Sequence, residues 1–155
     1  MIELRNITFD NFNECIKLEV REDQKGFVAT NICSLAQAYV ALSNNDCIPM
    51  PYAIYADDVM IGFIMLSYGE EDGDNEKSYG VWRFMIDKEH QGKGYGREAM
   101  VKALELIKTF PHGKASIVYI SYELENEAAK ALYLSLGFVE TGKVEEGEMV
   151  SKLAL

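Results

Sequence analysis

The amino-acid sequence predicts one α/β domain, and three observations lead to this prediction. First, 48% of the 155 residues are apolar, which suffices for the core of a single domain spanning residues 1–155. Second, segments with β-strand patterns are interspersed with segments of helical periodicity along the chain. Third, the apolar segment 79–86 leads into a glycine-rich turn, 91–96, that opens a helical pattern. The start of a helix after such a turn is where proteins commonly bind anions.

The first half of the chain has the pattern of a strand, two helices and a hairpin. Residues 2–6 have the pattern of a strand, and residues 10–20 have that of a helix whose apolar positions recur every four residues. A second helix is expected over 34–42, where a capping-box sequence begins it. The β-rich segments 52–56 and 59–67 enclose two turn-tolerant aspartates, which predicts a β-hairpin.

The second half continues with the central strand, the glycine turn and its helix, which ends before the breaker residues 111–113. A short apolar strand is expected over 117–121. A helix follows over 126–135, with a glycine just beyond its end as the terminating residue. The segments 138–143 and 148–153 then predict a final antiparallel pair of strands.

The glycine-rich turn is a candidate binding site for a pyrophosphate. Its free backbone N–H groups would lie at the positive end of a helix dipole. A Walker A loop is excluded, because Gly94 stands where Ser or Thr is needed after the Gly-Lys pair. A Rossmann fingerprint fails from Gly92, because Arg97 replaces its last glycine, and survives from Gly94 only in the looser form that ends in Ala99. The arrangement that remains is Gln-x-x-Gly-x-Gly over 91–96.

The charge of the chain narrows the class of ligand. Acidic residues number 25 and basic residues 15, which gives a formal net charge of −10. Nucleic acid would be repelled by this charge, whereas a cationic small molecule or a basic peptide would be attracted. The sequence therefore disfavours nucleic acid as a partner.

The amino terminus and the cysteines predict the environment of the protein. The amino terminus lacks a basic region followed by an apolar run, and no apolar run is long enough to span a membrane. We therefore expect a soluble cytoplasmic protein with no membrane partner. Cys15, Cys33 and Cys47 are odd in number and lack C-x-x-C spacing, so we expect reduced thiols and no metal site.

Two segments together carry a resemblance to a known family. The first is the turn 91–96, Q-G-K-G-Y-G, after its strand, and the second is 126–138, N-E-A-A-K-A-L-Y-L-S-L-G-F. In this order, separated by one helix and one strand, they resemble the GCN5-related N-acetyltransferase (GNAT) family, and the resemblance covers about residues 2–155 in element order. It implies an α/β (α+β) fold: a mixed, mostly antiparallel sheet of six to seven strands, splayed at its centre and flanked by about four helices.

The resemblance also implies acetyl-CoA as the cofactor, with its pantetheine arm in the gap of the splayed sheet and its pyrophosphate on the glycine turn. Coenzyme A is an anion, so an acidic protein needs local positive charge to bind it, and lysines and an arginine around the turn supply this charge. The cofactor-binding residues that the resemblance implies are Phe84, Met85, Ile86, Gln91, Gly92, Lys93, Gly94, Tyr95, Gly96, Arg97 and Asn126. Asn126 is explained equally well as a helix N-cap.

The family reaction is direct attack of an amine on the thioester. The departing thiolate needs a proton, and Tyr133 occupies the family's position for this general acid. An alkyl ammonium has a pKa near about 10.4, so a base must also remove a proton from the amine. The candidates are ordered water and several carboxylates, none of which the sequence ranks above water: Glu123, Glu19, Glu22 and the acidic residues among Glu70, Glu71, Asp72 and Asp74.

The amine is predicted to be a polyamine. The longer strings 79–87 and 91–99 resemble the bacterial spermine/spermidine acetyltransferase branch of the family, in which a homodimer is expected. Carboxylates spaced along a groove match a flexible polycation, and aromatic faces hold its ammonium groups. The substrate-binding candidates are Glu19, Glu22, Glu70, Glu71 and Trp82. The alternatives are another amine, such as an aminoglycoside or a protein amino terminus, and a non-catalytic acyl-CoA-binding sensor.

Overall fold

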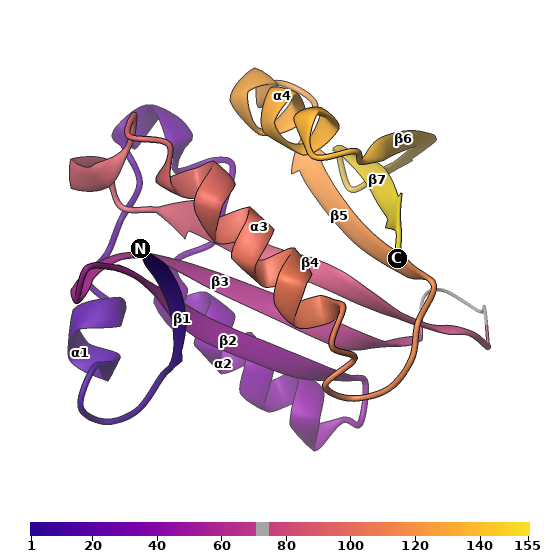
Figure 1. Cartoon of the computed structure of the whole chain (residues 1–155), viewed down its shortest axis with the longest axis horizontal. Coiled ribbons are helices and arrows are strands. Elements are labelled where there is room, and N and C mark those ends of the chain that lie inside the picture. Colours follow the sequence, from indigo (N-terminus) through magenta and orange to yellow (C-terminus); the bar gives the residue numbers. More distant parts are fainter. Residues whose placement is uncertain (71–74) are drawn as a thin grey trace.

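One sheet is the framework of the molecule in the computed structural model, which describes residues 1–70 and 75–155 (Figure 1). In these residues its order is β1-β2-β3-β4-β5-β7-β6, and the paired strands are antiparallel except for β4 and β5. The predicted mixed, mostly antiparallel sheet is therefore confirmed. The strands are β1 (Ile2–Asn6), β2 (Cys47–Ala56), β3 (Val59–Glu70), β4 (Lys77–Ile86), β5 (Ile117–Glu123), β6 (Val139–Glu145) and β7 (Glu148–Ala154).

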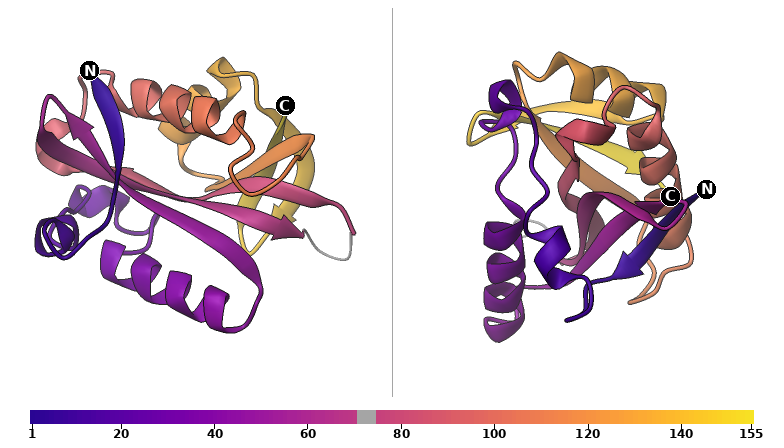
Figure 2. Two further views of the ribbon diagram at one scale, coloured as in Figure 1. Left: turned by 60° about the horizontal axis from the view of Figure 1, so that its bottom comes forward. Right: turned by 90° about the vertical axis from the view of Figure 1, so that its left-hand side faces the viewer.

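Helices cover both faces of this sheet. Figure 2 shows α1 and α2 against one face and α3 against the other, and α4 lies on the same side as α3. Each face has its own buried apolar cluster, because α3 and α4 pack on one side of the strands and α1 and α2 on the other. The helices are α1 (Phe12–Cys15), α2 (Asn31–Ser43), α3 (Tyr95–Ile107) and α4 (Glu127–Ser135), with short 3₁₀ turns η1 (Glu22–Gln24) and η2 (Lys88–His90).

The first helix is much shorter than predicted. The periodicity predicted a helix over 10–20, but α1 ends at Cys15. The backbone N–H of Glu19 donates to Asp87 Oδ1 at 2.9 Å, and its carbonyl accepts from the N–H of Lys88, also at 2.9 Å. These groups are bonded to the end of β4, so they are not free for a helical ladder. Tertiary hydrogen bonds therefore override the local pattern.

The second helix begins earlier than predicted, at Asn31 instead of Ser34. Thr30 is its N-cap, because the Thr30 hydroxyl oxygen accepts a hydrogen bond from the N–H of Cys33 at 3.1 Å. Ser34 lies in the first turn, where its hydroxyl donates to the Thr30 carbonyl at 3.0 Å. The predicted capping box is thus one turn inside the helix.

The sheet opens between β4 and β5. Tyr79 to Val81 pair in parallel with residues 118–120 of β5, and this pairing does not extend beyond Val81. The register between β3 and β4 shifts next to Trp82, which is the extra residue of a β-bulge. The predicted splay therefore lies at the strand that precedes the glycine turn.

Candidate active site

A cavity of about 1520 Å³ occupies the region where β4 and β5 separate. Its lining comes from β4, the glycine turn, β5, α4 and the β6–β7 hairpin, with further residues from the segment between α1 and α2, from α2 and from the adjoining ends of β2 and β3. Ligand pockets in proteins usually have volumes of roughly 300–1,000 Å³. This cavity is therefore large enough for a coenzyme and a small second ligand together.

The glycine turn forms one end of the cavity. Gly92 and Gly94 have positive φ angles of 78° and 82°, a conformation that residues with a Cβ rarely adopt. A Cβ added at either glycine would have no atom within 4 Å apart from the chain neighbours, so the backbone here faces open space. Gly94 is also the N-cap of α3, which places the free N–H groups of the helix start at the cavity. The turn fits a phosphate-bearing group.

The cationic side chains of the turn lie beside the cavity and not in its lining. Lys93 and Arg97 are exposed, and the Arg97 guanidinium donates to the Ser135 hydroxyl at 2.7 Å. This bond connects the start of α3 to the end of α4. Positive charge thus surrounds the turn on its solvent side.

Gln91 supports the turn through its own hydrogen bonds. Its side-chain amide donates to the carbonyl of Ile86 at 2.9 Å and to Gln24 Oε1 at 2.8 Å. The two bonds attach the turn to the end of β4 and to η1. The side chain of Gln91 is therefore engaged by the protein, and what the turn offers to a ligand is mainly backbone.

The central strand presents its end to the cavity. Phe84, Met85 and Ile86 all line it. Met85 is buried in the cluster beneath α1 and α2, whereas Phe84 and Ile86 pack toward α3. Because their side chains point to the two faces of the sheet, the main chain of these residues faces the gap toward β5.

Tyr133 lies on α4, on the wall opposite β4. It is 6% exposed, with its ring 5.7 Å from that of Tyr122 and 6.1 Å from that of Phe138. Burial raises the pKa of Tyr133, and the charge of Glu148 raises it further. Tyr133 therefore keeps its proton at neutral pH, as a proton donor must.

The hydroxyl of Tyr133 is available to a ligand. In the described residues, every fully buried side-chain nitrogen or oxygen atom has a hydrogen-bond partner. The Tyr133 hydroxyl has no partner within residues 1–70 and 75–155, so it cannot be one of these fully enclosed atoms. Tyr133 lines the cavity, and its hydroxyl is therefore accessible from that side.

Asn126 is observed as a helix cap. Its Oδ1 accepts a hydrogen bond from the N–H of Ala129 at 3.2 Å and so caps α4. The residue also lines the cavity. The capping explanation is confirmed, and a contact with the cofactor stays a prediction.

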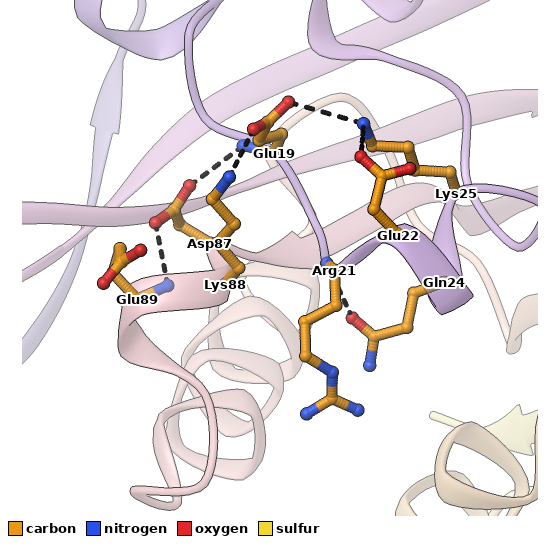
Figure 3. Close-up of polar contacts among 8 residues, drawn as sticks. All are labelled: Glu19, Arg21, Glu22, Gln24, Lys25, Asp87, Lys88 and Glu89. Carbon is orange, nitrogen blue, oxygen red and sulfur yellow. Dashed lines mark hydrogen bonds and ion pairs between the residues drawn. The ribbon is translucent and has the colours of Figure 1, made fainter.

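The predicted substrate ligands are dispersed. Trp82 and Glu70 line the cavity, and Glu71 lies outside the described residues. Glu19 and Glu22 do not line it. Figure 3 shows both in ion pairs: Glu19 with Lys88 at 2.5 Å and with Lys25 at 3.7 Å, and Glu22 with Lys25 at 2.6 Å.

The ion pairs change the electrostatics of these two glutamates. The hydrogen bond and charge of Lys88, together with the charge of Lys25, lower the pKa of Glu19. The negative charge of Glu19 is thus compensated within the protein. This cluster holds the segment 19–25 against η2 and leaves less charge there to attract a substrate cation.

Asp87 connects the segment after α1 to the turn after β4 (Figure 3). The side chain, only 7% exposed, accepts hydrogen bonds from the backbone N–H groups of Glu19 at 2.9 Å and Glu89 at 3.1 Å. It therefore joins the segment after α1 to the turn after β4. Sequence reasoning assigned no role to Asp87, although an aspartate before a short helical turn is a recognisable N-cap signal.

Sequence reasoning also missed three carboxylates of the β6–β7 hairpin. Together with Glu123 of β5, which the sequence offered as a candidate base, they line the cavity: Glu145, Glu146 and Glu148. The string E-E-G-E between two predicted strands was the available signal. Nothing local shows, however, that this hairpin lies beside β5.

The fold and the cavity define a protein that accommodates a phosphate-bearing coenzyme and a second ligand between two diverging strands. The acetyltransferase (GNAT) family model matches residues 5–138. The chain belongs to this family, and it is an acetyl-CoA-dependent N-acetyltransferase.

Two curated relatives are similar over nearly their whole length. The probable spermine N(1)-acetyltransferase of Bacillus subtilis subsp. natto is 30% identical over 155 residues, covering 96% of this chain and 95% of that protein. The spermine/spermidine N(1)-acetyltransferase of Bacillus subtilis strain 168 matches with the same identity and coverage.

Solved structures share the fold. An aminoglycoside acetyltransferase in complex with coenzyme A has a TM-score of 0.77 and 17% identity, covering 99% of this chain and 95% of that one. The spermidine N-acetyltransferase of Vibrio cholerae in complex with coenzyme A and spermine has a TM-score of 0.72 and 21% identity, covering 99% and 94%. In the described part of the chain, no helix has the length and apolarity that crossing a membrane requires.

The support of the turn by Asp87 can be tested by Asp87→Ala. The change removes the acceptor of two backbone N–H groups, so we expect the free energy of unfolding to fall by about 1–3 kcal/mol. Amide exchange should accelerate at Glu19 and Glu89. Glu89→Ala is the matched control, because it keeps the backbone N–H that Asp87 accepts. Unchanged exchange at Glu19 in Asp87→Ala would contradict the role of Asp87.

Proposed function

We propose that the protein acetylates a primary amine of a polyamine, with acetyl-CoA as the donor. The observation that carries the proposal is the charge of the cavity. Six carboxylate side chains line it in the described part of the chain, against the cationic Lys25 and Arg83: Asp46, Glu70, Glu123, Glu145, Glu146 and Glu148. Such a lining favours a ligand with several positive charges. The two Bacillus relatives that are named for spermine or spermidine support the same substrate class.

The cofactor is proposed to bind along β4 and the glycine turn. Main-chain groups of Phe84, Met85 and Ile86 would hold the pantetheine arm. The N–H groups of the turn, from Gln91 through Gly92, Gly94, Tyr95 and Gly96, would hold the pyrophosphate, with Lys93 and Arg97 compensating its charge. Asn126 would contact the cofactor from the start of α4. When bound, acetyl-CoA supplies the activated acetyl group as a thioester.

Tyr133 is proposed as the general acid. Its accessible, protonated hydroxyl can donate to the departing sulfur. The amine, protonated in solution, has to lose a proton before it attacks. Ordered water in the cavity is the proposed acceptor of this proton.

We also propose the oligomeric state, location and partners of the enzyme. A homodimer is expected from the family resemblance, and a cytoplasmic location from the amino-terminal sequence, the absence of a long apolar run and the cysteine pattern. The partners are then a small cationic amine and a second copy of the chain, with neither nucleic acid nor membrane.

A panel of amines with acetyl-CoA tests the proposed substrate class. Release of free thiol should be fast with spermidine and spermine and slow with aminoglycosides and peptides. The physical reason is the number of carboxylates that a flexible polycation can meet in the cavity. Turnover confined to aminoglycosides or peptide amino termini would overturn the polyamine substrate. Coenzyme binding without turnover of any amine would instead indicate an acyl-CoA sensor.

The role of Tyr133 is tested by Tyr133→Phe. We expect kcat to fall by on the order of 10²-fold or more, a typical general-acid contribution, with coenzyme affinity little changed. Tyr68→Phe is the control, because Tyr68 is also buried but lies outside the cavity lining. Steady-state kinetics and calorimetric titration with coenzyme A measure the two quantities. A kcat close to that of wild type would remove Tyr133 from this role.

The role of the glycine turn is tested by Gly94→Glu. The side chain would place a negative charge at the proposed pyrophosphate site and strain a residue with φ of 82°, so coenzyme A binding should be lost. Gly142→Glu is a matched control, because Gly142 has φ of 83°, open space around it and a position in β6 outside the cavity lining. If both variants bind coenzyme A like wild type in calorimetry, the turn is not the phosphate site.

A further inference from the structure

Three glutamates lie abreast on the three strands at the end of the sheet. Glu123 of β5 is directly opposite Glu148 of β7, and Glu148 is in turn opposite Glu145 of β6. Directly opposed residues project from the same face of a sheet, with Cβ atoms about 4.5–5.5 Å apart. All three line the active-site cavity.

Two of these carboxylates have no ion-pair partner in the described part of the chain. Glu145 is paired with Lys143. Glu123 and Glu148 form no ion pair with any residue in 1–70 or 75–155; Glu148 accepts one hydrogen bond, from the Ser121 hydroxyl at 3.3 Å. Like charges directly opposite each other destabilise a sheet. Burial raises the pKa of Glu148, and the charge of Glu123 raises it further, whereas the hydrogen bond from Ser121 and the charge of Arg83 lower it.

The pair faces the side of the gap that the cofactor phosphates would not occupy. Along β5, Ile120 and Tyr122 are buried in the cluster beneath α3 and α4. Side chains alternate along a strand, so Ser121 and Glu123 project from the other face. The glycine turn and its cations lie with α3. The anionic and the cationic ligands thus meet opposite faces of the sheet.

Tyr133, which reaches the same cavity from the α4 side, is the independent observation that a ligand enters this part of the gap. It is more than nine-tenths buried, its hydroxyl has no partner in the described part of the chain, and it lines the same cavity as Glu123 and Glu148. Glu148 is close enough for its charge to act on the phenol. A group bound at Tyr133 is therefore within the field of the carboxylate pair.

We infer that Glu123 and Glu148 form a cation subsite that binds a second, non-reacting ammonium group of the substrate and so selects diamines and polyamines over monoamines. This inference rests on the proposed polyamine acetyltransferase function. The pair suits the non-reacting nitrogen because adjacent carboxylates favour the charged form of an ammonium group. The reacting nitrogen needs the opposite, since it attacks only after losing its proton. Binding of the cation also removes the repulsion between the two carboxylates.

The test compares diaminobutane with pentylamine, which has a methyl group in place of the second ammonium. In Glu148→Gln and in Glu123→Gln, kcat/KM for diaminobutane should fall by about tenfold or more, and that for pentylamine should stay within about twofold. Glu125→Gln is the matched control, because Glu125 is exposed near Glu123 but outside the cavity lining. Both test variants should unfold at or above the wild-type temperature, because each relieves a like-charge pair.

Calorimetric binding of diaminobutane to the coenzyme A complex gives a readout that does not need turnover. Loss of this binding in the two variants supports the subsite even if wild type acetylates neither amine, in which case the proposed function fails and the subsite stands. Equal losses for both amines, unchanged kinetics and binding in both variants, or no diaminobutane binding to wild type would each overturn the subsite.

Discussion

The end of pairing between β4 and β5 is the constraint on which the rest of the site depends. Beyond Val81 the two strands separate, and the backbone of β4 then has no strand partner on one side. Unpaired backbone groups are costly to bury, so a gap of this kind is stable only if water or a ligand meets them. The bulge at Trp82 starts this departure, and Asp87 fixes the end of the strand to the segment after α1. The active site thus lies where the pairing of the sheet ends, at a position fixed by the bulge and by Asp87.

The local parts of this arrangement could be predicted from the sequence. The glycine turn, the strand before it, the helix after it and the N-cap Asn126 are set by neighbouring residues and were found. The length of α1 could not be predicted, because the N–H of Glu19 bonds to Asp87, which is 68 residues away in the chain. The helical periodicity of residues 10–20 is present in the sequence, but this tertiary hydrogen bond prevents the helix from extending to Glu19. The same long-range contact brings Glu19 into its ion pair with Lys88.

The carboxylates of the site show the same limit. The sequence indicated an acidic protein with a cationic ligand, but it directed attention to runs of acidic residues near 19–24 and 70–76. In the structure, Glu19 and Glu22 are neutralised by Lys88 and Lys25. Carboxylates without an ion-pair partner in the described residues instead lie where β7 pairs with β5, and that register is a property of the assembled sheet. A run of acidic residues in the sequence is therefore a weaker guide to the position of a cation site than the pairing of strands.

The arrangement also explains how a protein of net charge −10 can hold an anionic coenzyme. Because the effective dielectric of a cavity is low, the binding of a charged ligand depends more on the charges close to it than on the net charge of the protein. The sheet itself separates two charged regions: the start of α3, with Lys93 and Arg97, is on one face, and Glu123 and Glu148 project from the other. The gap between β4 and β5 is where the two faces communicate, and Tyr133 lines it. For the proposed polyamine substrate, this distribution of charge would let the anionic acetyl donor and the cationic acceptor approach the same opening from opposite faces of the sheet.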